Sequence, residues 1–402
     1  MENIPILNYA KLRVSWGANG NRDIPGNLGR YAAISRLTTG KYQYITPGGQ
    51  VLLVSQLYVD QLQNPDLKWE RTTSYNAGLD FSILKSRISG SFDAYRKTTT
   101  NLLVTRVVPD ATGFTTVLYN IGEVRNQGVE LSLSSINISK PNFSWRSTAT
   151  LTVNRNKIIH LYGPTNDYDA TGKVIGRSEK NDPSNRWFIG QDIDVIWDLK
   201  VLGVWQQNEA TEAAKYGVRP GDFKLEDVNK DGKFSDADRQ FIGFRNPRFM
   251  WSLRNEFTFL KNFDFSFLIY SNWGMSEEFN QAKNNGGFID RQNSYKVPYW
   301  TPENPINDYA RLFSSNGSAS FSAYRKTSFI RLSTMALAYT LPARILSRAK
   351  IQSLKVYANV NNLAVYQPEW TWWDAEFRVN PPTDRAIIPP PRYYTLGINL
   401  TL

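Results

Sequence analysis

The chain has 402 residues, of which 41% are hydrophobic and 13% aromatic, and its formal net charge is +11. It contains no cysteine and a single histidine, which excludes thiol chemistry and any metal site built from several histidines. Its lysines and arginines are scattered among apolar residues and are not gathered on one element, so the positive charge does not predict binding to nucleic acid.

Alternation of apolar and polar residues with a period of two predicts β-strands along the whole chain. Asn255 interrupts the apolar face of one such strand, which weakens the register prediction there. The chain contains no run of about 18 apolar residues, so no membrane-spanning helix is predicted. The sequence therefore predicts an all-β fold of about ten strands, at 12–16, 75–81, 88–95, 129–134, 143–153, 251–259, 263–269, 328–341, 354–360 and 394–402.

The connections between these strands alternate in length. Short links at 84–87, 137–142, 261–262 and 342–351 alternate with long ones at 99–122, 157–246, 274–326 and 363–390. Outer-membrane barrels show this alternation, because short turns face the periplasm and long loops face outside. A soluble β-sandwich has no reason to sort its loops by length. The pattern favours part of an antiparallel transmembrane β-barrel, with residues 394–402 as a strand that is apolar toward lipid.

One segment of the long 157–246 connection has the spacing of a calcium loop, at 227–238. Gly232, at the sixth position, allows the sharp turn that such loops need. The twelfth position is aspartate instead of the usual glutamate, and the alternative is an ordinary Asp/Asn/Gly turn without an ion. We expect a structural calcium ion whose ligands are Asp227, Asn229, Asp231, the carbonyl of Lys233, and Asp238.

Tryptophans gather in two of the long loops, of which 363–390 is also rich in proline. Exposed aromatic rings can stack on sugars or on peptide side chains, whereas the alternative is packing within the loops or against a partner. The substrate-binding candidates are Trp187, Trp197, Trp370, Trp372 and Trp373.

Catalytic residues are not expected. Asp192 and Asp194 could be imagined as a hydrolase pair, but their spacing alone is weak evidence, and solvated loop charge explains it as well. His160 has no serine or cysteine nucleophile motif to serve. The sequence therefore predicts a protein that is not an enzyme.

Several collinear motifs resemble those of SusC-like (SusC/RagA family) TonB-dependent outer-membrane transporters. They include NPDLKWE at 64–70, NRNKI at 154–158, PGD at 220–222 leading into DVNKDG at 227–232, and FIRL at 329–332. One departure is Leu402, because these barrels usually end in phenylalanine. The motifs cover nearly the whole chain, so the resemblance is specific as a set.

The resemblance implies a barrel of about 22 strands with a plug domain inside it, in the outer membrane of a Gram-negative bacterium. Residues 1–402 would be the C-terminal part of such a barrel, in contact with membrane lipid and without the plug. The first residues carry no export signal, so we expect the chain to be processed or to belong to something larger. An N-terminal barrel and plug portion would then come from another chain or a removed segment.

The implied function is import of oligosaccharides or peptides, with energy supplied by TonB through the plug and with a SusD-like surface lipoprotein as partner. The alternative is a secreted, calcium-stabilised, carbohydrate-binding β-protein.

Overall fold

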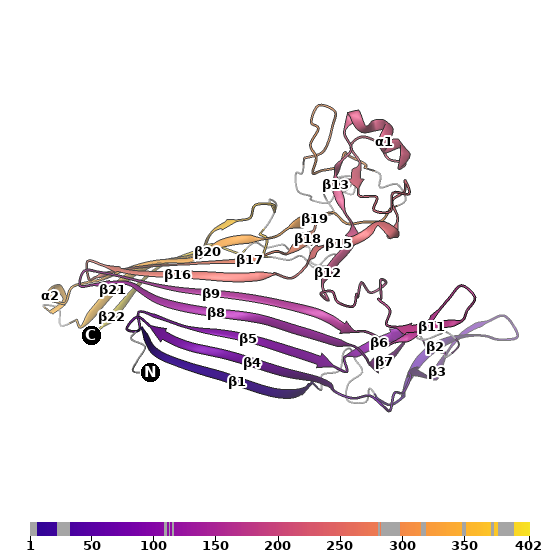
Figure 1. Cartoon of the computed structure of the whole chain (residues 1–402), viewed down its shortest axis with the longest axis horizontal. Helices are drawn as coiled ribbons and strands as arrows, with labels where there is room; N and C mark the ends of the chain where they lie inside the picture. The colour runs from indigo at the N-terminus through magenta and orange to yellow at the C-terminus, as the bar shows by residue number, and fades with distance from the viewer. Residues whose placement is uncertain are drawn as a thin grey trace.

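The computed structural model describes residues 6–21, 33–107, 111, 113–114, 116–279, 282, 298–314, 319–347, 351–370, 374–376 and 390–402. Its main feature is a ten-stranded antiparallel sheet in which sequential strands lie side by side (Figure 1). The prediction of about ten barrel strands is confirmed. In sheet order the strands are β1 (Leu7–Asn21), β4 (Glu70–Ile83), β5 (Ile88–Thr100), β8 (Glu123–Lys140), β9 (Phe143–His160), β16 (Phe249–Phe259), β17 (Phe263–Trp273), β20 (Phe329–Thr340), β21 (Ser353–Tyr366) and β22 (Tyr393–Thr401).

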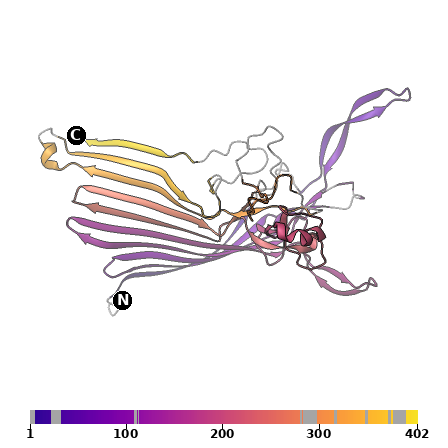
Figure 2. The same cartoon turned by 90° about the horizontal axis from the view of Figure 1, so that it is seen from above.

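The short connections all lie at one end of the sheet, where β1 begins and β22 ends (Figure 2). The predicted turn at 137–142 is wrong in its extent, because β8 continues to Lys140 and only residues 141–142 form the turn. A register shift between Ile136 and Ile138 explains the error, since a bulge breaks the alternation that sequence reading depends on. The fourth short connection contains the helix α2 (Ala343–Leu346).

Strand pairing sorts the side chains into an apolar face and a polar face. Leu12, Leu79, Phe92, Leu131 and Leu151 pair in turn across β1, β4, β5, β8 and β9 and form one row of the apolar face. The adjacent row, on the opposite face, is polar and contains Arg13, Asp93 and Glu130. Leu12 is 74% exposed, and Leu396 on β22 is 85% exposed. A broad exposed apolar face of this kind is what a sheet presents to lipid.

Asn255 lies on the apolar face without disturbing the register. It pairs with Ser147 on β9 and Phe267 on β17 and is 5% exposed. Its Oδ1 accepts hydrogen bonds from Trp145 Nε1 at 2.8 Å and Ser147 Oγ at 2.6 Å. The polar group is therefore satisfied by its neighbours, as a position on a lipid-facing surface requires.

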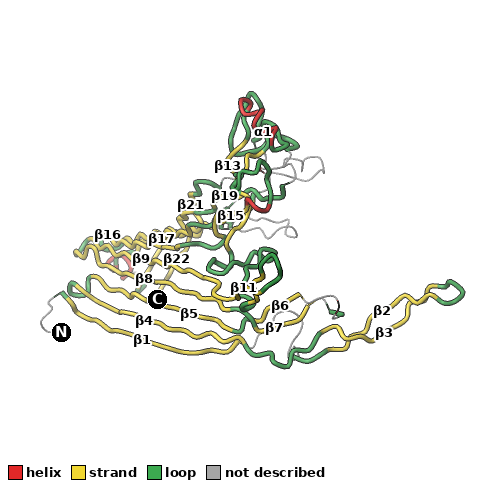
Figure 3. The backbone as a smooth tube through the Cα atoms, turned by 45° about the vertical axis from the view of Figure 1, so that its right-hand side comes forward, coloured by secondary structure: helices red, strands yellow, loops and turns green. Residues whose placement is uncertain are grey.

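The long connections lie at the opposite end and carry small structures of their own. The hairpin of β2 and β3 projects away from the sheet (Figure 3). None of the described helices is long and apolar enough to span a membrane. The elements are β2 (Arg36–Ile45), β3 (Val51–Gln61), β6 (Leu103–Val107), β7 (Thr116–Asn120), β10 (Thr165–Tyr168), β11 (Val174–Ser178), β12 (Val195–Leu199), β13 (Val201–Val204), η3 (Gln207–Glu209), α1 (Ala210–Lys215), β14 (Phe223–Leu225), η4 (Asp236–Asp238), β15 (Arg239–Phe244), β18 (Ser276–Glu278) and β19 (Tyr324–Lys326).

The main buried apolar core is formed by these connections together with Phe329, the first residue of β20. We call it the loop core. Figure 1 shows its elements β13 and α1 rising from the end of the sheet. Its buried members are Leu199, Val204, Trp205, Ala213, Val218, Phe223, Leu225, Phe234, Met275, Phe279, Ala282, Trp300, Tyr309, Ala310, Phe321, Ala323, Phe329, Trp370 and Ala375.

Candidate functional site

The loop core joins three connections that are far apart in the sequence. The ring of Phe223, from the connection between β9 and β16, meets that of Phe321, from the connection between β17 and β20, at 6.1 Å. Phe279 of the second connection meets Trp370 of the connection between β21 and β22 at 5.7 Å. Burial of large aromatic side chains contributes most of the energy in such a core. The long loops therefore form one assembly at the end of the sheet.

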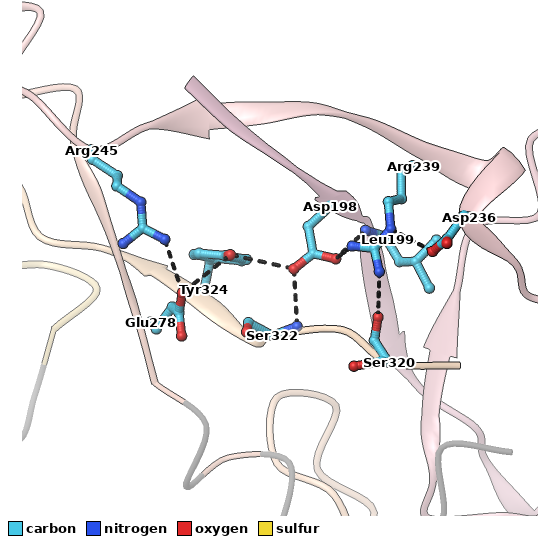
Figure 4. Close-up of polar contacts among 9 residues, drawn as sticks. All are labelled: Asp198, Leu199, Asp236, Arg239, Arg245, Glu278, Ser320, Ser322 and Tyr324. Atoms are coloured by element: carbon cyan, nitrogen blue, oxygen red, sulfur yellow. Dashed lines mark hydrogen bonds and ion pairs between the residues drawn. The ribbon is translucent and has the colours of Figure 1, made fainter. Parts of the chain in front are cut away.

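A buried polar network fastens two of these connections together (Figure 4). Asp198, at the end of β12, is 1% exposed and forms an ion pair with Arg239 on β15. Its Oδ2 accepts hydrogen bonds from the backbone N–H of Ser322 at 3.1 Å and the hydroxyl of Tyr324 at 3.3 Å. Because Ser322 and Tyr324 belong to the other connection, this one carboxylate bridges both loops. We call it the Asp198 network.

Tyr324 and Arg245 extend the network. Arg245 donates a hydrogen bond to Glu278 on β18 at 2.9 Å. Burial, together with the nearby carboxylates of Asp198 and Glu278, raises the pKa of Tyr324 to about 12. The hydroxyl therefore stays protonated at neutral pH and remains a hydrogen-bond donor between the two carboxylates.

A second buried ion pair holds the connection between β21 and β22. Arg331, on the polar face of β20, is 2% exposed and forms an ion pair with Asp374. Its Nε lies 3.1 Å from Glu376, which also accepts a hydrogen bond from Tyr270 on β17 at 2.5 Å. Residues 374–376 are thus fixed against the polar face of the sheet.

The polar face is hollowed near the short turns. The hollow has a volume of about 720 Å³, and its walls include Arg146, Arg254, Glu256, Asp264 and Lys355. Charges of both signs line it, so it favours neither anions nor cations strongly. A hollow of this kind suits an aqueous interior next to a lipid-facing wall.

The predicted calcium loop adopts a compact turn. Asp227 Oδ2 accepts hydrogen bonds from the backbone N–H of Gly232 at 2.9 Å and from the hydroxyl of Tyr216 at 3.1 Å. Its buried Oδ1 has no hydrogen-bond partner in the described part of the chain. Burial opposes ionisation of Asp227, but these hydrogen bonds outweigh burial and lower its pKa. Asp227 is therefore ionised and has one oxygen available.

The other predicted ligands form hydrogen bonds within the loop. Asp238 is fully buried, and its two oxygens accept hydrogen bonds from the backbone N–H groups of Val228 and Ser235, both at 2.9 Å. Asn229 and Asp231 bond to one another at 3.0 Å. The backbone N–H of Lys233 donates to Asp231 at 2.9 Å. Within the described residues, no group of three or more His, Cys, Asp or Glu side chains stands ready to hold a metal ion.

Of the predicted tryptophans, Trp187, Trp197 and Trp370 lie within the described residues. Trp370 is 1% exposed within the loop core, so the expectation that its ring is exposed is wrong. Trp187 and Trp197 are half-buried, and Trp197 packs on Phe188 at 4.9 Å and under Arg239 at 5.6 Å. Trp372 and Trp373 lie outside the described residues. Burial of Trp370 follows from tertiary packing, which no spacing in the sequence reveals.

The two aspartates considered as a hydrolase pair each accept a hydrogen bond from a neighbouring side chain. Asp192 accepts from Arg248 at 2.9 Å, and Asp194 accepts from Asn246. His160 contacts Glu179 at 2.9 Å. Sequence reasoning missed Asp198 and Arg331, because a buried charge in a strand looks like any solvated one until its partner is known.

A family model and several known proteins match the sequence of this chain. A family model described as TonB dependent receptor-like, beta-barrel matches residues 8–363. TonB-dependent receptor P26 of Formosa agariphila is 30% identical over 100% of this chain, and TonB-dependent receptor SusC of Bacteroides thetaiotaomicron is 28% identical over 66% of it. The chain covers 40% and 25% of these two relatives, respectively.

Solved structures give the same fold. A chain in a structure of the RagAB peptide transporter superposes with a TM-score of 0.73 at 22% identity, covering 99% of this chain and 41% of that chain. The same transporter in its closed-closed state gives a TM-score of 0.69. The family resemblance and the barrel fold predicted from the sequence are confirmed.

Proposed function

Because the chain belongs to the TonB-dependent receptor-like β-barrel family, and is therefore an outer-membrane protein, we propose that it forms part of the wall and outer vestibule of a nutrient importer. The two-faced sheet is the observation that carries this proposal. Its apolar face is exposed, and its polar face carries the hollow lined by charged residues. A soluble carbohydrate-binding protein would have to cover the apolar face, so the secreted alternative is disfavoured.

The proposed importer needs strands beyond this sheet. Within the described sheet, β1 and β22 are the two edges. Unpaired backbone groups in lipid are costly, so we propose that strands of the remaining barrel pair with both edges. That remaining portion, supplied by another chain or segment, would hold the plug on which TonB acts. The chain spans about two fifths of the P26 relative, which leaves room for these parts.

A SusD-like surface lipoprotein is the proposed partner outside the membrane. The β2–β3 hairpin projects from the loop end of the sheet and pairs only with itself among the described strands. Leu53 and Leu57 on it are 66% and 65% exposed. An exposed apolar hairpin of this kind is suited to contact another protein.

The proposed cargo is an oligosaccharide or a peptide, and no catalytic step is proposed. Support for a peptide comes from the structural neighbour, which is described as a peptide transporter. Trp187 and Trp197, with Trp372 and Trp373, stay the proposed aromatic contacts for the cargo. The loop core and the Asp198 network would hold the vestibule in shape.

We also propose that the 227–238 loop binds a structural calcium ion. The support is the ionised Asp227, whose buried Oδ1 lacks a hydrogen-bond partner among the described residues. Calcium prefers carboxylate and carbonyl oxygens, which Asp227, Asn229, Asp231, Lys233 and Asp238 would supply after a local rearrangement.

Uptake in cells tests the proposed import. Cells with and without this chain would be given labelled oligopeptides and labelled oligosaccharides, and accumulation would be measured before and after the proton gradient is collapsed. We expect accumulation of one class to need both the chain and the gradient. Accumulation that is equal without the chain, or that survives collapse of the gradient, would contradict the proposal.

A further inference from the structure

The apolar face changes character at one row of paired residues. Trp16, Tyr75, Arg96, Gln127 and Arg155 pair in turn across β1, β4, β5, β8 and β9. The row on the side of the short turns is wholly apolar, and consists of Val14, Ala77, Ala94, Val129 and Val153. The row on the side of the long loops is Ala18, Thr73, Thr98, Arg125 and Lys157.

This change marks the outer boundary of the lipid-facing band. Trp16 and Tyr75 are 65% and 55% exposed, and exposed aromatic rings at the edge of an apolar band lie at the membrane–water interface. Successive rows on one face are roughly 7 Å apart. Arg96, Arg155, Arg125 and Lys157 therefore lie at the depth of the lipid headgroups, on the side of the long loops.

The basic residues form a cluster that is poorly neutralised. Together with Arg248, they make five cations, and among the described residues two carboxylates pair with them: Asp192 with Arg248 at 2.9 Å and Glu123 with Arg125 at 3.5 Å. Arg96, Arg155 and Lys157 have no carboxylate within ion-pair distance among the described residues. Arg155 instead donates to the backbone carbonyl of Arg248.

The cluster also encloses a space. Arg125, Arg155, Lys157 and Arg248 line a hollow of about 360 Å³ together with residues 190–192. The Nε of Arg125 is buried there without a hydrogen-bond partner in the described part of the chain. Arginine side chains hold phosphate through paired hydrogen bonds, so an anion would satisfy these donors.

We propose that this cluster binds the phosphate of a phosphorylated glycolipid in the outer leaflet, whose acyl chains lie on the apolar face below it. The register places Arg96, Arg125, Arg155 and Lys157 on the apolar side of the wall, so cargo passing along the polar face does not reach these side chains. The continuous apolar rows beneath it select a lipid over a free anion. The proposal concerns lipid recognition and stands apart from the import of any nutrient.

Lipid binding to the complete transporter, purified in neutral detergent, tests the proposal. Lipid A with its phosphate and the same lipid after dephosphorylation would be titrated, and bound lipid counted by native mass spectrometry. Each cation near a lipid surface contributes about fivefold to affinity, so R125Q/R155Q/K157Q is expected to weaken binding of the phosphorylated lipid by about a hundredfold. K157Q alone, at an exposed side chain, is expected to weaken it about fivefold without affecting folding.

The matched control is K97Q/R146Q/R254Q, which removes the same charge from the polar face of the same sheet, on β5, β9 and β16. Lys97 pairs with Asn126, and Arg146 with Glu256, on that face. The control should bind lipid as wild type does. Equal binding by wild type and R125Q/R155Q/K157Q, equal loss in the control, or equal binding of the dephosphorylated lipid would overturn the proposal. So would displacement of the lipid by millimolar inorganic phosphate, which would indicate a free-anion site.

Discussion

The two carboxylate oxygens of Asp227 differ in their contacts, and this difference bears on calcium binding. One of its oxygens is held by Gly232 and Tyr216, while the other is buried without a partner among the described residues. A buried oxygen in that state costs free energy unless something occupies the space beside it. A calcium ion would remove that cost. The lowered pKa of Asp227 means that its contribution is present above the usual aspartate range and is lost as pH falls below it.

Chelation provides the test at this scale. Calcium at about a hundred times its dissociation constant would stabilise the loop by about 2.7 kcal/mol, so a chelator should speed proteolysis within residues 210–240 of wild type. Asp231→Ala should be cut quickly with or without chelator. The control is Asp169→Ala, which removes an acidic turn residue that accepts from Thr171 and Lys173 outside the calcium spacing. Chelation that leaves wild type and Asp231→Ala equally resistant would contradict the calcium proposal.

At the scale of elements, the Asp198 network decides how β12 and β15 are held against β19. Asp198 is 1% exposed, whereas Asp236, which pairs with the same Arg239, has a side chain that is 86% exposed. Breaking a buried ion pair leaves a charge uncompensated, but an exposed pair contributes little. The two carboxylates on one arginine thus differ greatly in what they contribute to the fold.

This difference predicts the behaviour of two matched variants. Asp198→Asn should destabilise the loop assembly by roughly 3 kcal/mol, seen as faster hydrogen exchange at residues 195–199 and 320–326. Asp236→Asn should change the free energy of hydrogen exchange in these two segments by less than about 1 kcal/mol. Exchange in the strands of the large sheet should not change in either variant. Equal effects of the two substitutions would show that burial of Asp198 is unimportant.

For the whole molecule, the sheet has an apolar face to cover and two edges to pair. Covering the face needs lipid or detergent, and pairing the edges needs more strands. The requirement for lipid is met by the outer membrane, and the proposed requirement for more strands can be examined separately.

Expression alone and with the remaining barrel separates the two requirements. We expect the chain with its complement to extract into detergent and to migrate faster on a gel when unheated, as closed barrels do. The chain alone should migrate identically heated and unheated. A heat-sensitive band from the chain alone would show that the described strands close without further ones.

The sequence was informative where local pattern decides structure. Alternation and loop length predicted the ten strands of the sheet and which of their connections are short, because a sheet with unlike faces imposes a period of two. The strands extend beyond the predicted ranges, as β1 (Leu7–Asn21) does beyond 12–16. The bulge near Ile136 escaped prediction, since one inserted residue shifts the pattern without leaving a signature. Trp370 and Asp198 escaped for another reason: their burial depends on connections distant in sequence. The β2–β3 hairpin was missed although its Pro-Gly-Gly segment at 47–49 is a turn signal.

The loop core has a consequence for how such a protein can diverge. Because three connections share one apolar interior, a large substitution at Phe223 or Trp370 changes the space available to residues of another connection. Loops of this assembly cannot vary independently, as separate surface loops do. A change of specificity through them would therefore require matched substitutions in two or three connections at once, so the whole assembly is the unit on which selection acts.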